Sequence, residues 1–144
     1  FITGTGELTE SLKKEAANDS KITYTGRIED EDLKAYILAC DIFCFPSITK
    51  NEAFGVALAE AMYYGKPAVT FNIPGSGVNY VSLNGVTGIE VENRNVEAYA
   101  NAIRNVSTNK ELKVKYGQAG RKRVMNCFLS SQFCENIKDI LLKR

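Results

Sequence analysis

Short apolar runs alternate along the chain with longer segments in which apolar residues recur at helical spacing. The short runs predict strands at residues 22–24, 41–45, 68–71 and 88–91. The periodic segments predict helices at residues 8–18, 30–39, 54–64, 96–107, 110–125 and 131–142. This alternation is typical of α/β proteins in which helices flank a parallel sheet. We therefore expect an α/β fold of this kind with additional C-terminal helices.

Several predicted elements have marked ends. An acidic first turn opens the helix at residues 30–39 and suits the helix dipole. Pro46 ends the strand at 41–45, and Gly65 followed by Pro67 ends the helix at 54–64. Residues 72–79 are rich in turn formers, and no repeat or linker interrupts the chain. We expect one domain.

The composition excludes several classes of function. Of 144 residues, 44% are hydrophobic and 24% are charged, which is incompatible with a disordered chain. The 18 basic and 17 acidic residues give a net charge of +1, so we expect no nucleic-acid partner. The chain has no histidine, which excludes an imidazole base and a His-ligated zinc within it. Its chemistry must use carboxylates, hydroxyls, backbone amides or a bound cofactor.

The cysteines and the apolar runs bear on the cellular compartment. The spacing of Cys40, Cys44, Cys127 and Cys134 matches neither a zinc ribbon nor a secreted disulfide scaffold, so we expect buried reduced thiols, with one disulfide as the alternative. No apolar run approaches the ~18 residues of a membrane span, and no signal peptide opens the chain. We expect a cytoplasmic protein. Basic residues of the last two helices are expected to form a solvated face: Arg121, Lys122, Arg123, Lys143 and Arg144.

The segment 51–62 contains two glutamates, Glu52 and Glu60, eight positions apart. On one helix their side chains would be ~12 Å apart along the axis and ~80° apart around it. That separation argues against the acid and base pair of a lysozyme-like enzyme.

A binding role fits the same segment better. Glu52 precedes the predicted helix, and Gly55 would let the backbone approach a ligand. The amides of Phe54, Gly55 and Val56 would face an anion at the helix N-terminus. A sugar joined through a diphosphate to a ribose would place hydroxyls beside the two carboxylates. The alternative is that Glu52 caps the helix and Glu60 is solvated, but the apolar neighbours of Glu60 make an unpaired carboxylate costly there.

These residues belong to an ordered set of motifs between Gly4 and about Val91. The set comprises residues 24–28 (YTGRI), 39–47 (ACDIFCFPS), 52–62 (EAFGVALAEAM), 65–67 (GKP) and 84–88 (NGVTG). Their order and spacing resemble those of the group 1 (family 4) retaining glycosyltransferases.

The resemblance implies a GT-B architecture, in which residues 1–144 form most of the Rossmann-like, nucleotide-sugar-binding C-terminal domain. The chain opens in mid-strand without methionine. We expect it to lack that domain's first strand and helix, and the whole N-terminal acceptor domain. The family's diphosphate-binding Arg and Lys would then lie upstream.

The resemblance also assigns residue roles. It implies that Glu52 is the catalytic residue that contacts the transferred sugar, and that Glu60 holds the ribose. The amides of residues 54–56 would approach the sugar and diphosphate. Arg27 and Ile28 would line the base, and Gly4 and Gly6 would border the same cleft. The implied donor is a UDP-sugar or GDP-sugar, without a metal or other cofactor.

One departure from the family pattern concerns Tyr80. Many members carry Gly-Gly-x-x-Glu where this chain has residues 74–81 (PGSGVNYV). Tyr80 takes the place of the acid, so a role for that acid is in doubt here.

The resulting hypothesis is retaining transfer of a hexose to a glycan, lipid-linked or similar acceptor. The full-length enzyme would work in the cytoplasm, with peripheral membrane association compatible with its basic C-terminal helices, and this chain alone would be inactive. Two alternatives stay open. One is a non-catalytic sugar-nucleotide-binding module, and the other is a different GT-B enzyme such as a sugar-nucleotide epimerase or a phosphorylase.

Overall fold

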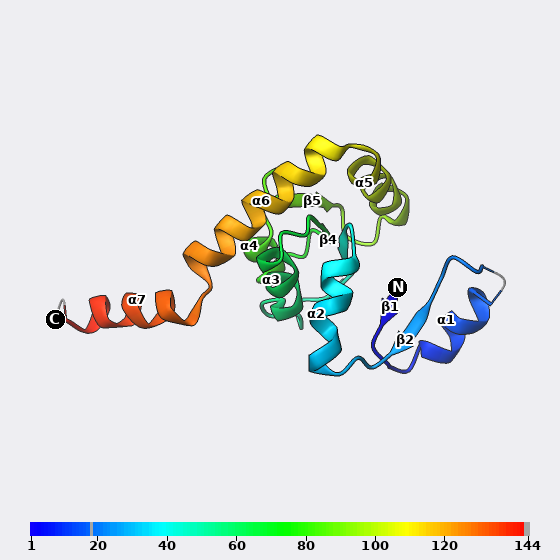
Figure 1. Cartoon of the computed structure of the whole chain (residues 1–144), viewed down its shortest axis with the longest axis horizontal. Coiled ribbons are helices and arrows are strands. Elements are labelled where there is room, and N and C mark those ends of the chain that lie inside the picture. Colours follow the sequence, from blue (N-terminus) through cyan, green and yellow to red (C-terminus); the bar gives the residue numbers. More distant parts are fainter. Residues whose placement is uncertain (18, 143–144) are drawn as a thin grey trace. The chain divides into compact units, whose positions relative to one another are not determined.

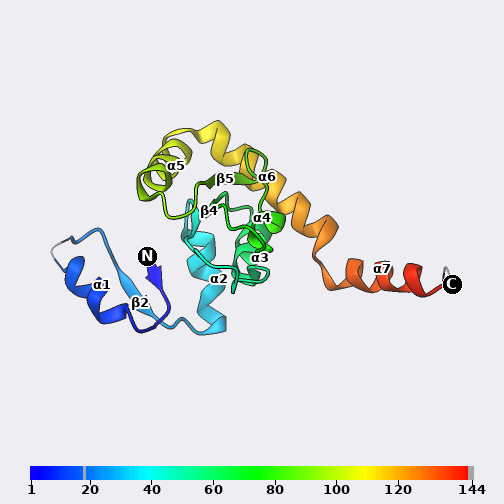
Figure 2. The same ribbon diagram turned by 180° about the vertical axis from the view of Figure 1, so that it is seen from behind.

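The computed structural model describes residues 1–17 and 19–142, except for the side chains of residues 133 and 136. The chain divides into two compact units, Phe1–Leu38 and Ala39–Arg144. Figure 1 labels the elements of both units, and Figure 2 shows them from behind. Each unit is described by itself.

The first unit is a small parallel strand pair with two helices. Strand β1 (Ile2–Thr3) pairs with β2 (Tyr24–Gly26), and helix α1 (Thr9–Glu15) connects them. Helix α2 (Asp30–Ala39) follows, with three acidic residues in its first turn. The Tyr24 hydroxyl donates to the Leu12 carbonyl at 2.8 Å and ties α1 to β2. Among the described residues of this unit, Ile37 alone is buried.

The second unit is built on a three-stranded parallel sheet in the order β3-β4-β5. Its strands are β3 (Phe43–Phe45), β4 (Ala68–Phe71) and β5 (Gly88–Val91). Its helices are α3 (Val56–Tyr63), α4 (Val78–Val81), α5 (Val96–Thr108), α6 (Lys110–Cys127) and α7 (Ser130–Leu142). All four residues of β4 are buried, as expected for a central strand covered on both faces.

Two hydrophobic clusters cover the two faces of this sheet. On one face, Ala68 packs with buried residues of α3, α4 and α6. On the other face, Val69 and Phe71 pack with Tyr99 and Ala102 of α5. Alternate residues of a strand point to opposite faces, so β4 supplies both clusters. Figures 1 and 2 show α5 across the sheet from α3 and α4.

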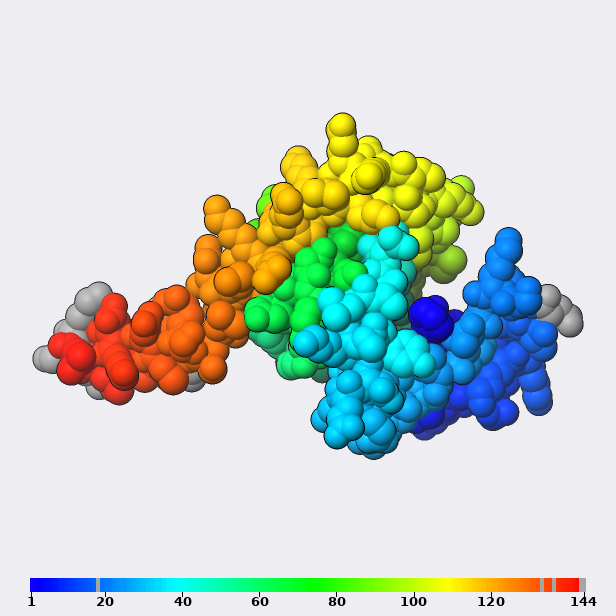
Figure 3. All heavy atoms as spheres, viewed as in Figure 1, coloured from blue at the N-terminus to red at the C-terminus, as the bar shows by residue number. Residues whose placement is uncertain are grey.

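Helix α6 packs closely against α3 because it has glycines at the contact. A Cβ on Gly117 would lie 2.1 Å from the Gly65 carbonyl oxygen, so no larger residue fits there. The same hypothetical atom on Gly120 would lie 3.5 Å from Met62 Cβ. Figure 3 shows the atoms of α6, yellow to orange, directly against those of α3, in green.

The structure confirms the α/β fold class, with parallel strands and flanking helices. The predicted limits of α2, β4 and β5 match the observed ones, and those of α5, α6 and α7 differ by two residues or fewer. The described strands form two sheets, one in each unit. Of the described helices, none has both the length and the apolar character needed to cross a bilayer.

The predicted limits of four elements were wrong. β2 lies two residues later than expected, because its pairing with β1 joins Ile2 to Tyr24. β3 begins at Phe43, where pairing with β4 begins, and α3 begins at Val56. Helix α1 ends at Glu15, and the predicted end, Asn18, lies outside the described residues. The predicted turn-rich stretch includes the start of the four-residue helix α4.

The four cysteines are free, which confirms the prediction of reduced thiols. Their predicted burial was wrong for three of them, because Cys44, Cys127 and Cys134 are exposed and Cys40 is partly buried. Cys44 alternates with Phe43 and Phe45, which pack against the cluster beside α3, so its side chain points away from that cluster.

Candidate functional site

The loop before α3 carries the predicted catalytic residue. Glu52 is partly buried, and its Oε1 atom accepts a hydrogen bond of 3.0 Å from the Gly55 amide. Gly55 is buried at the N-cap of α3 with φ of 87°, a left-handed conformation that favours glycine. Among the described residues, nothing donates to Glu52 Oε2, and nothing accepts from the amides of Phe54 and Val56. One carboxylate oxygen and two amides are therefore open at this helix N-terminus.

A second loop, which precedes α4, holds the main chain of the first. The Gly77 amide donates to the Ala53 carbonyl at 2.9 Å. The Ser76 hydroxyl donates to the Glu52 carbonyl and accepts from the Val78 amide at 3.2 Å. A Cβ on Gly77 would lie 2.2 Å from the Ala53 oxygen, so glycine is needed for this contact. We call residues 73–77 the bracing loop.

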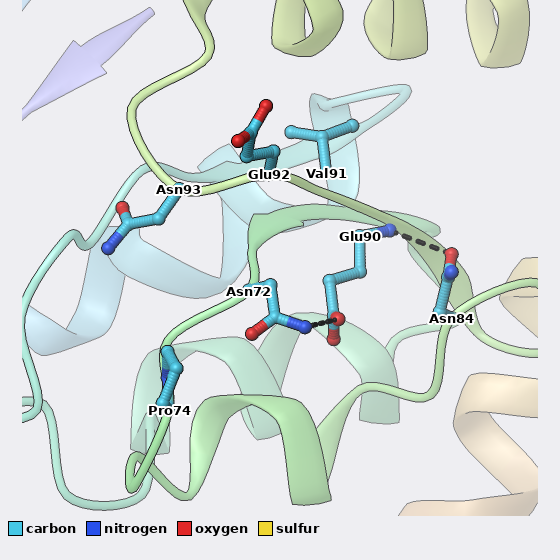
Figure 4. Close-up of a pocket in the computed structure, with 7 residues that line it drawn as sticks. All are labelled: Asn72, Pro74, Asn84, Glu90, Val91, Glu92 and Asn93. Carbon is cyan, nitrogen blue, oxygen red and sulfur yellow. Dashed lines mark hydrogen bonds between the residues drawn. The ribbon is translucent and has the colours of Figure 1, made fainter.

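Asn79 and Glu90 fix the bracing loop to the sheet. Asn79 accepts a hydrogen bond from the Ile73 amide at 2.7 Å and donates to the Phe71 carbonyl at 2.9 Å. The Asn79 side-chain amide also donates to Glu90 Oε2, and the Asn72 side-chain amide donates to Glu90 Oε1, both at 2.6 Å. Figure 4 shows the Asn72 amide directed at this carboxylate. These hydrogen bonds restrain the bracing loop.

An aromatic cluster includes Phe54, a residue of the loop before α3. The Phe54 ring, 37% exposed, meets the Phe128 ring edge-on at 5.4 Å between centroids. The Arg123 guanidinium lies over the Phe128 and Tyr80 rings at 5.3 and 5.2 Å. It also donates to the Val81 and Tyr80 carbonyls, at 3.0 and 2.5 Å, and so caps the C-terminus of α4.

The predicted solvated basic face was therefore wrong for Arg123. Arg121 and Lys122 are exposed, as expected. Lys143 and Arg144 lie outside the described residues. Tyr80 is 62% exposed, beside the Arg123 contact.

Glu60 lies on the solvent-exposed face of α3. Val56, Glu60 and Tyr63 are exposed at helical spacing, whereas Leu58, Ala59, Ala61 and Met62 are buried. The sequence argument that a carboxylate would be costly at this position was wrong, because its apolar neighbours face the core and Glu60 does not. The exposed face of α3 begins at Val56, which lies one turn nearer the helix N-terminus than Glu60. The two residues are about 6 Å apart along the axis.

The remaining predicted residues lie in the first unit, where β1 and β2 end. Gly4, with φ of 96°, donates from its amide to the Gly26 carbonyl at 2.7 Å. The Gly6 amide donates to the Thr9 hydroxyl at 2.8 Å. Both glycines line a hollow of about 240 Å³. Arg27, which is exposed, and Ile28, which is partly buried, follow β2 directly.

The structure thus brings the predicted residues together in two groups. One group is Glu52, the amides of residues 54–56, and Glu60; the other is Gly4, Gly6, Arg27 and Ile28. The prediction of three free amides was wrong for Gly55, because the Glu52 carboxylate occupies its amide. Phe54 precedes α3 instead of belonging to it.

Sequence reasoning missed the part played by Ser76 and Gly77, which it treated as a turn. A signal was present in their position. They follow β4, and parallel strands end at one edge of a sheet, so this loop had to lie beside the loop that follows β3. Their hydrogen bonds to Glu52 and Ala53 depend on the tertiary fold.

A larger hollow of about 520 Å³ lies at the β5 side of the sheet (Figure 4). Asn72, Glu90, Glu92 and Asn93 line it, and it includes none of the predicted site residues. The Glu90 carboxylate is occupied by its two asparagine partners. Within the described part of the chain, no three Cys, Asp or Glu residues gather to hold a metal ion.

Comparison with known proteins agrees with the family resemblance. Residues 1–123 match the family described as glycosyl transferases group 1. O-antigen chain mannosyltransferase C of Escherichia coli is 27% identical over 136 residues, which are 93% of this chain and 36% of that protein. The D-rhamnosyltransferase WbpZ of Pseudomonas aeruginosa is 35% identical over 105 residues, 72% of this chain and 27% of that protein.

The fold also has close counterparts among solved structures. HepE of Anabaena, solved in complex with UDP-glucose, superimposes with a TM-score of 0.82 at 19% identity, over 99% of this chain and 40% of that one. The chain spans about a third of the length of the two curated relatives. The match over residues 1–123 covers most of the chain, and the chain therefore belongs to the group 1 glycosyltransferase family.

Proposed function

We propose that this chain binds a nucleoside-diphosphate sugar and that the full-length protein transfers the sugar with retention of configuration. The observation that carries the proposal is the loop before α3. Among the described residues, this loop leaves one carboxylate oxygen of Glu52 and the amides of Phe54 and Val56 without a hydrogen-bond partner. A sugar joined to a diphosphate offers hydroxyl donors to the carboxylate oxygen and phosphate oxygens to the two amides.

In this proposal, the ligand runs across the N-terminus of α3. The diphosphate accepts hydrogen bonds from the Phe54 and Val56 amides, aided by the positive end of the helix dipole. A sugar hydroxyl donates to Glu52 Oε2, and the ribose hydroxyls donate to Glu60 on the exposed face of the same helix. The Gly55 amide binds Glu52 instead of the ligand and holds that carboxylate in place.

Four further residues are proposed to bind the donor, as the family resemblance implies. Arg27 and Ile28 follow β2, and Gly4 and Gly6 line the hollow beside β1. We propose that these residues line the base and border the cleft. No other cofactor and no metal enter this proposal.

The amides at the helix N-terminus would also promote the reaction. Negative charge develops on the diphosphate as the bond to the sugar breaks. Donors that already point at the developing charge stabilise the transition state, by ~3–4 kcal/mol for a strong donor in comparable sites. Glu52 orients the sugar ring in this mechanism and does not attack it.

The names of the relatives support a hexose as the transferred sugar. Two of them are named as a mannosyltransferase and a rhamnosyltransferase, and a fold neighbour was solved with UDP-glucose. We propose a hexose donor carried on UDP or GDP, with a glycan or lipid-linked acceptor held by a separate N-terminal domain. The full-length enzyme would act in the cytoplasm, with peripheral membrane association.

The test is the transfer rate of the full-length protein with UDP-glucose and GDP-mannose. Glu52→Ala should lower kcat about 100-fold, the effect typical of losing one preorganised contact. Glu97→Ala, at an exposed carboxylate in the first turn of α5, is the matched control and should keep the wild-type rate. A Glu52→Ala rate close to wild type would remove Glu52 from the mechanism. Donor binding without transfer by the wild-type protein would favour a binding module.

A further inference from the structure

The Ser76 hydroxyl joins the loop before α3 to the start of α4. It donates to the carbonyl oxygen of Glu52 and accepts from the Val78 amide, so its one donor and one of its two acceptor lone pairs are used. Ser76 is itself only partly exposed, in a loop that Asn79 fixes to β4. The hydroxyl is thus held at a defined place.

Glu52 is consequently held at two points. Its carbonyl oxygen is bound by Ser76, and its carboxylate is bound by the Gly55 amide. The contact with the Gly55 amide can fix the position of the carboxylate oxygen only if the main chain of Glu52 is itself fixed. Small displacements of a reacting or orienting group have large effects on catalysis.

We propose that Ser76 is a positioning residue, which sets the place of the Glu52 carboxylate through the Glu52 main chain. The inference rests on the proposed function of Glu52. Ser76 touches no ligand in this account. It acts on the transferred sugar only through Glu52.

Loss of the hydroxyl should loosen Glu52 without detaching the loop. The Gly77 amide still binds the Ala53 carbonyl in a Ser76→Ala variant, and Arg123 still caps α4. We therefore expect the variant to fold. The displacement is confined to Glu52, whose own contact is with the sugar.

The experiment compares donors, because a ratio of rates is independent of the fraction of folded protein. The full-length protein is assayed with whichever of UDP-glucose and GDP-mannose it turns over, and with the monodeoxy analogues of that sugar. In Ser76→Ala, the preference in kcat/KM for the complete sugar over the analogue that loses the Glu52 contact should fall about tenfold. That is the change expected when one hydrogen bond to a charged group is weakened. Ser76→Thr, which keeps the hydroxyl, should restore the preference.

Tyr99→Phe is the matched control. It also removes one hydroxyl donor to a main-chain carbonyl, that of Val69, on the face of the sheet opposite α3. Its donor preference should equal that of the wild type. An unchanged preference in Ser76→Ala, or a preference that stays at the Ser76→Ala level in a folded Ser76→Thr, would overturn the inference. A wild-type protein that turns over neither donor would instead overturn the proposed function.

Discussion

The loops before α1 and α3 share a local design and differ in their surroundings. Each follows a parallel strand, and each contains a glycine with a left-handed backbone, Gly4 with φ of 96° and Gly55 with φ of 87°. A Cβ on Gly55 would lie 3.4 Å from Leu58 Cβ, whereas a Cβ on Gly4 would have nothing within 4 Å. Gly55 is buried and Gly4 is exposed.

The difference continues in the hydrogen bonds. The loop before α1 is bound by its neighbour Thr9 and by the Gly26 carbonyl. The loop before α3 is bound by its own Glu52 and also by Ser76 and Gly77, which lie more than 20 residues later in the chain. Contacts with residues far along the chain fix the geometry of the loop before α3. Stabilisation of a transition state needs groups held in such a fixed geometry. We therefore assign the chemistry to the loop before α3 and contacts that tolerate movement to the loop before α1.

The largest change in stability should come from disrupting the contact between the bracing loop and the loop before α3. Gly77→Ala places a Cβ 2.2 Å from the Ala53 oxygen, so one of the two loops must move. Overpacking of this kind should cost about 3 kcal/mol of unfolding free energy. Urea unfolding measures it. Because Gly77 has an ordinary helical backbone, with φ of −72°, the effect isolates the steric contact.

The matched variant in the other loop is Gly6→Ala, whose new Cβ would have nothing within 4 Å. Its unfolding free energy should stay within about 0.5 kcal/mol of the wild type. Equal losses in Gly77→Ala and Gly6→Ala would show that the two loops are equally constrained.

A smaller change in stability, of opposite sign, is expected in the buried strand β4. Thr70 in β4 is 1% exposed, and its hydroxyl has no hydrogen-bond partner among the described residues. Thr70→Val keeps the shape and removes this unpaired group, so it should stabilise the protein by about 1 kcal/mol. Thermal unfolding measures the change, and a destabilised variant would mean that the hydroxyl is paired.

The smallest effect concerns the ion pair of Asp41 with Lys113 of α6, at 2.7 Å. The hydrogen bond and the charge of Lys113 lower the pKa of Asp41 below its ordinary value. A carboxylate with a lowered pKa contributes stability above its unfolded pKa of about 3.9 and loses it as pH falls through the folded value. Asp41→Asn should therefore be less stable than the wild type at neutral pH. In unfolding measured across pH, the difference should begin to shrink at about pH 4 and should be lost only as pH falls through the lower folded pKa of Asp41; a difference that does not shrink below about pH 4 would contradict the assignment.

The elements that the sequence predicted best are those that local pattern determines. β4 is a short run in which Thr70 is the one polar residue, and α5 has clear helical periodicity, so their limits follow from the residues alone. β2 was displaced by two residues because its limits depend on pairing with β1. Glu52 and Glu60 were chosen from their motif, and their roles stay predictions.

The contacts between the bracing loop and the loop before α3 could not be predicted in the same way. The need for glycine at position 77 arises from the carbonyl of Ala53, and the place of Ser76 from that of Glu52. The helical backbone of Gly77 gives no local reason for glycine. Such contacts exist only once β3 and β4 lie side by side, so the sequence pattern does not contain them.

The most direct test of the central claim is amide hydrogen exchange in the full-length protein, with and without saturating UDP-glucose or GDP-mannose. Binding should slow exchange at Phe54 and Val56, whose amides have no hydrogen-bond partner among the described residues. Exchange at Gly55, already bonded to Glu52, should change least. Measurable donor binding with unchanged exchange at Phe54 and Val56 would contradict the claim that the N-terminus of α3 holds the diphosphate.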